Sequence, residues 1–379
     1  MCNITNKNDY LPTRLIDAHP GLHNDAVRLV ASTDIQDNHM KYAALSHSWG
    51  PKSQRIKPIP KTTKQSITDR MNHISFDELT RTFQDAVIVA RRLDIRYIWI
   101  DSLCIVQHDE EDFVEQVRNM LKVYGEAHLV ISALRAATGD MGLFHERPAT
   151  LRISQDDGWG NTVTACVRPG AQHEDFFTAS PRSFAVAPLF ARAWCFQERL
   201  AARRLIHFSE SEIVYECNRN LVCECNSSAV PIDLETSGNF RRRQALALQK
   251  ATVESRLNTW YDVLRPYTFR SLTVESDRLP ALSGFAQRVA LPELGRYCAG
   301  FWESELPVAL LWRILRPLPE NGDLIKRPNE YQAPSWAWPS VQAVIEPYMR
   351  FDKRTQIVAE VLEFVCEPAT SDPYGKVKS

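Results

Sequence analysis

The sequence contains no apolar run that approaches the roughly 18 to 20 residues needed to cross a bilayer. Residues 1–10 lack the basic and apolar regions of a signal peptide, so we expect a cytoplasmic protein with no membrane partner. The net charge is −1, from 45 basic and 46 acidic side chains, which gives no global field to recruit nucleic acid. Neither a fixed-period repeat nor a P-loop phosphate motif is present.

The cysteines do not form a recognisable framework. They number nine, an odd count that favours reduced thiols over disulfides in a cytoplasmic protein. The tightest group is Cys217, Cys223 and Cys225, and its spacing does not match the paired spacings of structural zinc sites. We therefore expect no metal site.

Two short polar clusters each follow a segment that is typical of a buried β-strand. Residues 46–50 (SHSWG) follow an apolar strand at 42–45, and residues 101–104 (DSLC) follow another at 97–100. A helical segment separates the two strands, so a right-handed crossover makes them parallel. Because ligands bind outside the carboxyl ends of parallel strands, this shared edge is the best candidate for a functional site.

The other periodic segments predict a mixture of helices and strands. Ser75 and Glu78 form a capping-box pattern, Asp109 and Gly125 bracket a second apolar stripe, and the arginine run at 241–243 is expected to be solvated. We predict helices at 76–93, 109–125, 190–200 and 244–263, strands at 127–133, 204–208 and 213–217, a hairpin around 162–167, and edge strands at 13–16 and 27–30.

These elements, with 44% hydrophobic residues, predict an α/β fold. We expect a mostly parallel central sheet with flanking helices, and a C-terminal extension packed on it rather than freely linked. The predicted division is an N-terminal segment at 1–40, an α/β domain at 41–230 and a mixed helical and strand extension at 231–379.

Four motifs together resemble the fungal heterokaryon-incompatibility (HET) domain. They are YAALSHSWG at 42–50, TFQDA at 82–86, YIWIDSLCI at 97–105 and RAWCFQER at 192–199, with weaker echoes at 276–284 and 333–338. The resemblance is specific over residues 42–217. Ser48 stands where the family often has cysteine, and residues 106–108 (VQH) replace a more usual Asp-Gln-Asp stretch.

The resemblance implies an effector in non-self recognition and regulated cell death, with a fold related to that of TIR domains. It also implies a ligand or substrate crevice at the sheet edge. Ser46, Trp49 and Gln197 are candidate ligand-binding residues there, together with Arg192 and Arg199, which could hold phosphates.

One candidate chemistry uses a thiol. Cys104 would be the nucleophile and His47 its base, since a thiolate needs a neighbouring imidazole near neutral pH, and Asp101 would orient the imidazole. Such an enzyme would be a transferase, hydrolase or cyclase of fungal secondary metabolism. The alternative interpretation is that all three residues only stabilise a strand-to-helix turn.

A second candidate chemistry uses a carboxylate. Glu198 could stabilise oxocarbenium-like charge while the bond between ribose and nicotinamide breaks, which would make NAD a substrate rather than a cofactor. Against this, a glutamate between Gln197 and Arg199 on a helix is more often in a surface ion pair. The sequence leaves three functions open: an interaction effector that self-associates, an NAD-cleaving hydrolase and a Cys-His enzyme.

Overall fold

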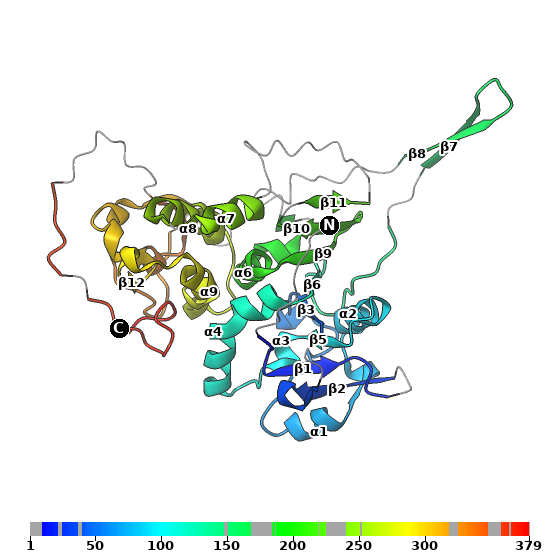
Figure 1. Cartoon of the computed structure of the whole chain (residues 1–379), viewed down its shortest axis with the longest axis horizontal. Coiled ribbons are helices and arrows are strands. Elements are labelled where there is room, and N and C mark those ends of the chain that lie inside the picture. Colours follow the sequence, from blue (N-terminus) through cyan, green and yellow to red (C-terminus); the bar gives the residue numbers. More distant parts are fainter. Residues whose placement is uncertain are drawn as a thin grey trace.

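The centre of the fold is a nine-stranded mixed sheet in the order β11-β10-β9-β6-β3-β5-β1-β2-β4 (Figure 1). It belongs to a computed structural model that describes residues 10–21, 25–36, 40–147, 151–167, 184–185, 187–218, 220–224, 240–250, 252–317, 325–347, 358–363 and 365–378.

Only the four central strands are parallel. They are β9 (Arg204–Phe208), β6 (Leu129–Ser132), β3 (Tyr42–Ser46) and β5 (Tyr97–Trp99). Every other pair in the sheet is antiparallel. The prediction of a mostly parallel sheet was therefore wrong. Three of the antiparallel pairs join strands that follow one another through short connections, which reverse the chain, and the other two join strands that are distant in the sequence.

The outer strands extend the sheet on both sides. β10 (Ile213–Cys217) and β11 (Leu221–Cys223) lie beyond β9. β1 (Arg14–Asp17), β2 (Ala26–Ala31) and β4 (Ile74–Ser75) lie beyond β5. The two predicted N-terminal strands are confirmed, but neither is at an edge, because β1 lies between β5 and β2, and β2 lies between β1 and β4.

The helices follow the predicted periodicity with shifted ends. The Ser75 and Glu78 capping box is present, but it caps a single 3-10 turn, and the helix itself begins at Arg81. The predicted helix at 244–263 corresponds to two helices, one that ends at Gln249 and one that begins at Val253. The helices are α1 (Ile67–Asn72), α2 (Arg81–Arg92), α3 (Asp101–Cys104), α4 (Glu110–Glu126), α6 (Ala193–Ala201), α7 (Phe240–Gln249), α8 (Val253–Thr268) and α9 (Pro280–Val289). No helix within the described ranges is long and apolar enough to span a membrane.

The C-terminal half has its own aromatic core, in which Trp260, Trp302 and Trp338 are almost fully buried. It contains two small antiparallel pairs, β12 (Tyr297–Cys298) with β13 (Phe301–Trp302) and β14 (Arg313–Pro317) with β15 (Ala343–Glu346). Cys298 and Cys366 form a disulfide. The expectation of reduced thiols throughout was therefore wrong at these two positions.

A buried ionic network lies under β9 and β10. The Glu216 carboxylate accepts hydrogen bonds from Arg199 at 2.9 and 3.1 Å and contacts His207 Nε2 at 2.9 Å. Arg241 Nη1 lies 3.8 Å from the same carboxylate, and Arg241 is 2% exposed. The arginine run was expected to be solvated, and this is wrong for Arg241, because burial beside an anion replaces its hydration.

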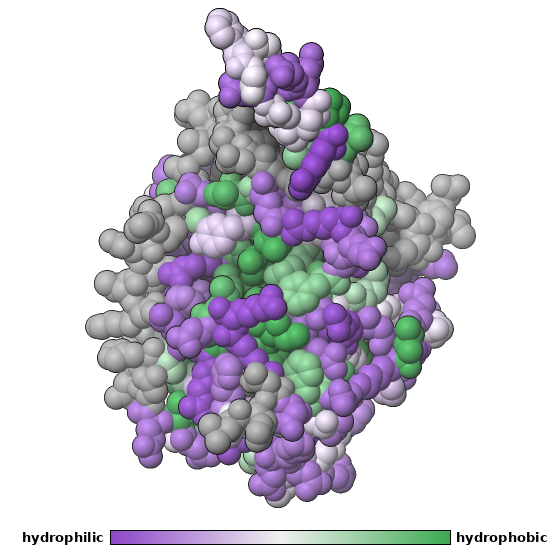
Figure 2. Space-filling model, turned by 90° about the vertical axis from the view of Figure 1, so that its right-hand side faces the viewer, coloured by the Kyte–Doolittle hydropathy of each residue, from purple (hydrophilic) through white to green (hydrophobic). Residues whose placement is uncertain are grey.

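A separate hairpin, β7 (Leu151–Asp156) and β8 (Thr162–Val167), projects from the rest of the described chain (Figure 1). Every residue of both strands is exposed. In the side view, apolar side chains gather in the centre of one face, hydrophilic residues surround them, and the hairpin protrudes at the top (Figure 2). The hairpin confirms the sequence prediction for residues 162–167.

Candidate functional site

The two polar clusters meet at one edge of the sheet, as predicted. β3 and β5 are adjacent and parallel, with Tyr42 opposite Tyr97 and Ala44 opposite Trp99. Their carboxyl ends therefore lie side by side. Residues 46–50 leave β3 there, and residues 101–104 form the single turn of α3.

A pocket of about 250 Å³ opens at this edge. Its lining combines polar and apolar residues, and part of it is supplied by residues 271–277, which follow α8. The lining residues used below are His47, Trp49, Arg55, Asp101, Arg192, Trp194, Cys195, Glu198, Leu272 and Asp277.

Asp101 connects the two clusters. Trp49 Nε1 donates a hydrogen bond to Asp101 Oδ2 at 2.9 Å, and His47 Nε2 lies 3.6 Å from Asp101 Oδ1. The His47 ring also packs edge-on against Phe83, with 4.9 Å between centroids. Burial lowers the pKa of His47, and the Asp101 carboxylate only partly opposes this effect. The imidazole is therefore neutral near pH 7 and is available as a base or acceptor.

Glu198 lies on α6 and is buried, with 6% of its surface exposed. Burial raises the pKa of its carboxyl group to about 7, whereas hydrogen bonds with the Ser46 and Tyr124 hydroxyls oppose the rise. The nearby Asp101 carboxylate adds to the rise and Arg192 opposes it. A carboxyl group with such a pKa exchanges its proton near neutral pH, as acid–base catalysts do.

Three cationic side chains contact residues 48–50. Arg55 donates to the Trp49 carbonyl at 2.9 Å and to the Gly50 carbonyl at 2.6 Å. The Lys61 ammonium lies 4.8 Å from the centre of the Trp49 ring. Arg192 donates to the Ser48 hydroxyl at 3.5 Å. A planar indole beside several cations is suited to a planar ligand that carries negative charge.

Three buried polar atoms of the lining lack a hydrogen-bond partner among the described residues. They are His47 Nε2, Arg192 Nε and Glu198 Oε2. Buried polar atoms are normally hydrogen-bonded, and leaving one unpaired costs about 1–3 kcal/mol. Their convergence on one pocket is what a site for a polar ligand requires.

Comparison with protein families supports the motif resemblance. The model of the heterokaryon incompatibility protein (HET) family matches residues 42–198, which supply His47, Asp101, Arg192 and Glu198 of this pocket. Residues 42–198 are a HET domain.

A curated relative supports the same assignment. Heterokaryon incompatibility protein 6, OR allele, of Neurospora crassa is 31% identical over 134 residues. The match covers 34% of this chain and 19% of the relative, so the chain matches about a fifth of the relative's length. No solved structure matches this chain.

Cys104 of the HET domain does not line the pocket. Its side chain is 1% exposed, and its sulfur accepts a hydrogen bond from the Ile100 amide at 3.5 Å. Burial raises the pKa of the thiol to about 12, so the thiolate is scarce near neutral pH. The structure gives the proposed Cys104 and His47 pair no support.

We expect iodoacetamide to alkylate the exposed Cys166 at neutral pH and to leave Cys104 unmodified in the native protein. Peptide mass spectrometry at successive times would measure both rates, and both residues should react after denaturation. Rapid modification of native Cys104 would restore the thiol interpretation.

Three other predicted ligand-binding residues lie elsewhere. Ser46 lies beneath the pocket, where its hydroxyl bonds Glu198. Gln197 is fully buried and accepts a hydrogen bond from the Gly284 amide at 3.0 Å, which joins α6 to α9. Arg199 points into the Glu216 network. Gln197 and Arg199 therefore do not line this pocket, because successive residues of a helix point in different directions.

The sequence argument missed Cys195, which lines the pocket between Arg192 and Glu198. These three residues are spaced three apart, which places them on one face of α6. That spacing could have identified Cys195. Trp194 and Asp277 were also missed; Trp194 Nε1 donates to Asp277 Oδ2 at 3.2 Å. Asp277 lies outside the HET match, although it falls within the weaker motif echo at 276–284.

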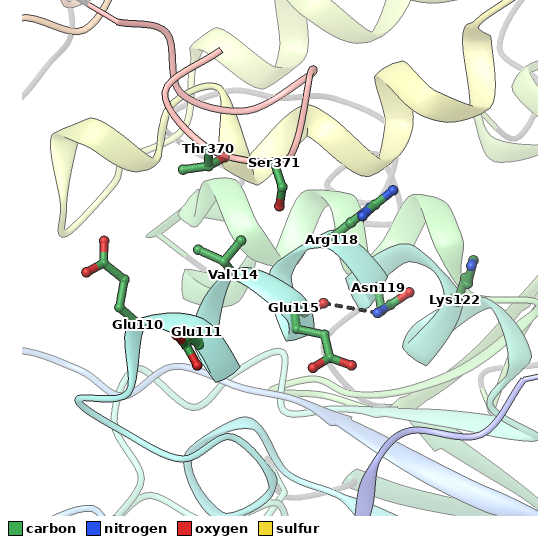
Figure 3. Close-up of a pocket in the computed structure, with 9 residues that line it drawn as sticks. All are labelled: Glu110, Glu111, Val114, Glu115, Arg118, Asn119, Lys122, Thr370 and Ser371. Atoms are coloured by element: carbon green, nitrogen blue, oxygen red, sulfur yellow. Dashed lines mark hydrogen bonds between the residues drawn. The ribbon is translucent and has the colours of Figure 1, made fainter.

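A larger pocket of about 680 Å³ lies between α4 and residues 370–371 (Figure 3). Its side chains spread apart in the close-up instead of converging, and none of its residues is buried. The lining includes Glu110, Glu111, Glu115, Arg118 and Lys122. These charges are solvated, so this pocket is a weaker candidate than the HET pocket.

Proposed function

We propose that this chain is an effector of fungal heterokaryon incompatibility and that its HET domain binds a small ligand in the pocket at the sheet edge. The observation that supports this function best is the coincidence of the family match with the pocket. His47, Asp101, Arg192 and Glu198 all come from residues 42–198, and three of them carry a buried polar atom that has no hydrogen-bond partner among the described residues.

The lining suggests the chemistry of the ligand. Trp49 and Trp194 offer indole surfaces, whereas Arg55 and Arg192 offer positive charge. A nucleotide combines a planar base with phosphate and fits both features. The volume of about 250 Å³ is slightly below the roughly 300–1,000 Å³ typical of drug-sized ligands, so only part of a dinucleotide would enter.

Inducible expression in a filamentous fungus tests the effector role. We expect the wild-type chain to reduce colony survival and Trp49→Ala to abolish this effect, because Trp49 forms a pocket wall and holds Asp101. Trp159→Ala is a matched control, since Trp159 is 89% exposed and lies in the turn of the projecting β7–β8 hairpin, outside the pocket lining (Figure 1). Killing by Trp49→Ala equal to that by the wild type would remove the pocket from the function. A harmless wild-type chain would contradict the effector role.

Glu198 favours a second candidate function, the hydrolysis of the N-glycosidic bond of NAD. Water would add to the ribose carbon, nicotinamide would leave with the bonding electrons, ADP-ribose would be the other product and one proton would be released. An ionised Glu198 would stabilise the positive charge that develops on the ribose. The indoles and the cations around the pocket would hold the remainder of the substrate.

Chromatographic measurement of nicotinamide released by the purified chain tests this candidate. We expect release to rise with pH through about 7, because the carboxylate form of Glu198 is the active one. Cys104→Ala should release nicotinamide at the wild-type rate, since Cys104 lies outside the pocket. If NAD binds but no nicotinamide appears on either side of pH 7, the pocket is a binding site and not a hydrolase.

A further inference from the structure

The β7–β8 hairpin has one apolar face and one polar face. Its register places Leu151 opposite Val167 and Ile153 opposite Ala165, so these residues share one apolar face. Arg152, Ser154 and Asp156 lie on the opposite, polar face of β7. Both strands are exposed throughout, and an isolated two-stranded hairpin is marginally stable in water. A further strand would therefore stabilise it.

The turn determines which backbone groups of β7 are not hydrogen-bonded to β8. The Asp157 amide donates to the Asn161 carbonyl at 3.0 Å, so residue 157 points toward the partner strand. The register is continuous from this turn through the hairpin, and backbone groups alternate along a strand. The amides and carbonyls of Arg152, Ser154 and Asp156 therefore point away from β8, toward the open edge.

This open edge is complementary to itself. Suppose that two copies of β7 pair in antiparallel fashion with Ser154 of one copy opposite Ser154 of the other. In this register, the outward backbone groups of Arg152 in each copy lie opposite those of Asp156 in the other. The same register places opposite charges directly across from each other at both ends of the pair, which stabilises a cross-strand contact. If the register shifts by two residues, Arg152 and Asp156 no longer lie opposite each other, and neither faces an opposite charge.

We propose that β7 is a dimerisation strand, and that two copies of this chain pair through it in the register centred on Ser154. The hairpins then form a four-stranded sheet in the order β8-β7-β7-β8. Three or more strands with an apolar face can be independently stable, whereas two cannot. This inference rests on the hairpin alone and goes beyond the ligand-binding function, because the two copies need not share a pocket.

Charge reversal tests the register. Sedimentation velocity of the full chain at low salt should show a concentration-dependent dimer, and Arg152→Asp or Asp156→Arg should each give monomers. An equal mixture of these two variants should form a heterodimer, because every cross-strand pair then joins opposite charges. The double variant R152D/D156R should dimerise by itself. Added salt should weaken each dimer, since these charges are exposed.

Proline provides a matched test of the edge. Ser154→Pro removes an outward amide of β7, whereas Thr164→Pro removes an outward amide of β8. We expect only Ser154→Pro to give monomers. A wild-type chain that stays monomeric at every concentration would overturn the proposal. Dimers of Arg152→Asp alone, or a mixture that fails to associate, would also overturn it.

Discussion

Replacing Glu216 with alanine is expected to lower the free energy of unfolding by about 3–5 kcal/mol, the usual cost of removing one partner from a buried ion pair. Glu216 is 1% exposed, and its carboxylate is shared by Arg199, Arg241 and His207. Alanine would leave two buried guanidinium groups without their anion. Chemical denaturation should show a lower midpoint with an unchanged slope.

Acidification of the wild type should remove the stabilisation that the Glu216 carboxylate provides. Burial alone would raise the pKa of Glu216, but the charges of Arg199 and Arg241 and the bond with His207 lower it below its ordinary value. The unfolded glutamate, with a pKa near 4.5, therefore takes up a proton before the folded one does. The stabilisation is present above about pH 4.5 and is lost as the pH falls further.

A matched carboxylate makes this experiment specific. Glu303 is paired with Arg296 on the surface, where both side chains are substantially exposed. Glu303→Ala should leave the denaturation midpoint close to that of the wild type, because water hydrates both groups. A Glu216→Ala protein as stable as Glu303→Ala would show that the buried network does not stabilise the fold.

Replacing Glu198 with glutamine is expected to reduce nicotinamide release by about 100-fold or more, the usual cost of losing one group that stabilises transition-state charge. The same variant should be more stable than the wild type above pH 7. The two effects are opposite because the pocket holds the carboxylate in surroundings that favour its neutral form. A residue that serves function at the expense of stability is expected to show lower activity and higher stability when it is replaced.

The sign of the stability change follows from the raised pKa. Between about pH 4.5 and 7 the folded Glu198 binds a proton that the unfolded residue has lost, so the wild type loses stability as the pH rises. The loss approaches about 3 kcal/mol above pH 7, at 1.36 kcal/mol per pKa unit. Glutamine remains neutral and avoids it.

Thermal or denaturant unfolding at several pH values would measure this difference. Glu254→Gln, at an exposed position on α8, is the matched control and should show no pH-dependent gain. Stability curves for Glu198→Gln and the wild type that run parallel across the whole range would show that Glu198 is not titrating near neutrality. Full activity with a stability gain would instead remove Glu198 from the chemistry.

Local sequence patterns predicted the elements at the site well. Apolar runs bounded by polar residues identified β3 and β5, and their parallel pairing correctly brought residues 46–50 and 101–104 to one edge. His47, Asp101 and Glu198 were predicted as site residues and all line the pocket. The placement of these residues at one edge could be predicted because it depends on short segments and on one crossover.

The residue types did not predict which way each side chain points. Cys104 and Cys195 are both buried cysteines beside site residues, yet only Cys195 lines the pocket. Arg192 and Arg199 lie on one helix, yet Arg199 and the distant Arg241 are held by Glu216. A side chain's partner depends on which segments pack against its face, and that packing has no local signature.

The sequence by itself determined the strands, the helix stripes, the polar clusters at the strand ends and the HET resemblance, because periodicity and short motifs are properties of neighbouring residues. Only the tertiary structure decided the mixed direction of the sheet, the pocket wall from residues beyond α8, the burial of Glu198 and the exposure of β7. Each of these depends on contacts between segments far apart in the chain, and those contacts set the solvation on which pKa and pairing depend.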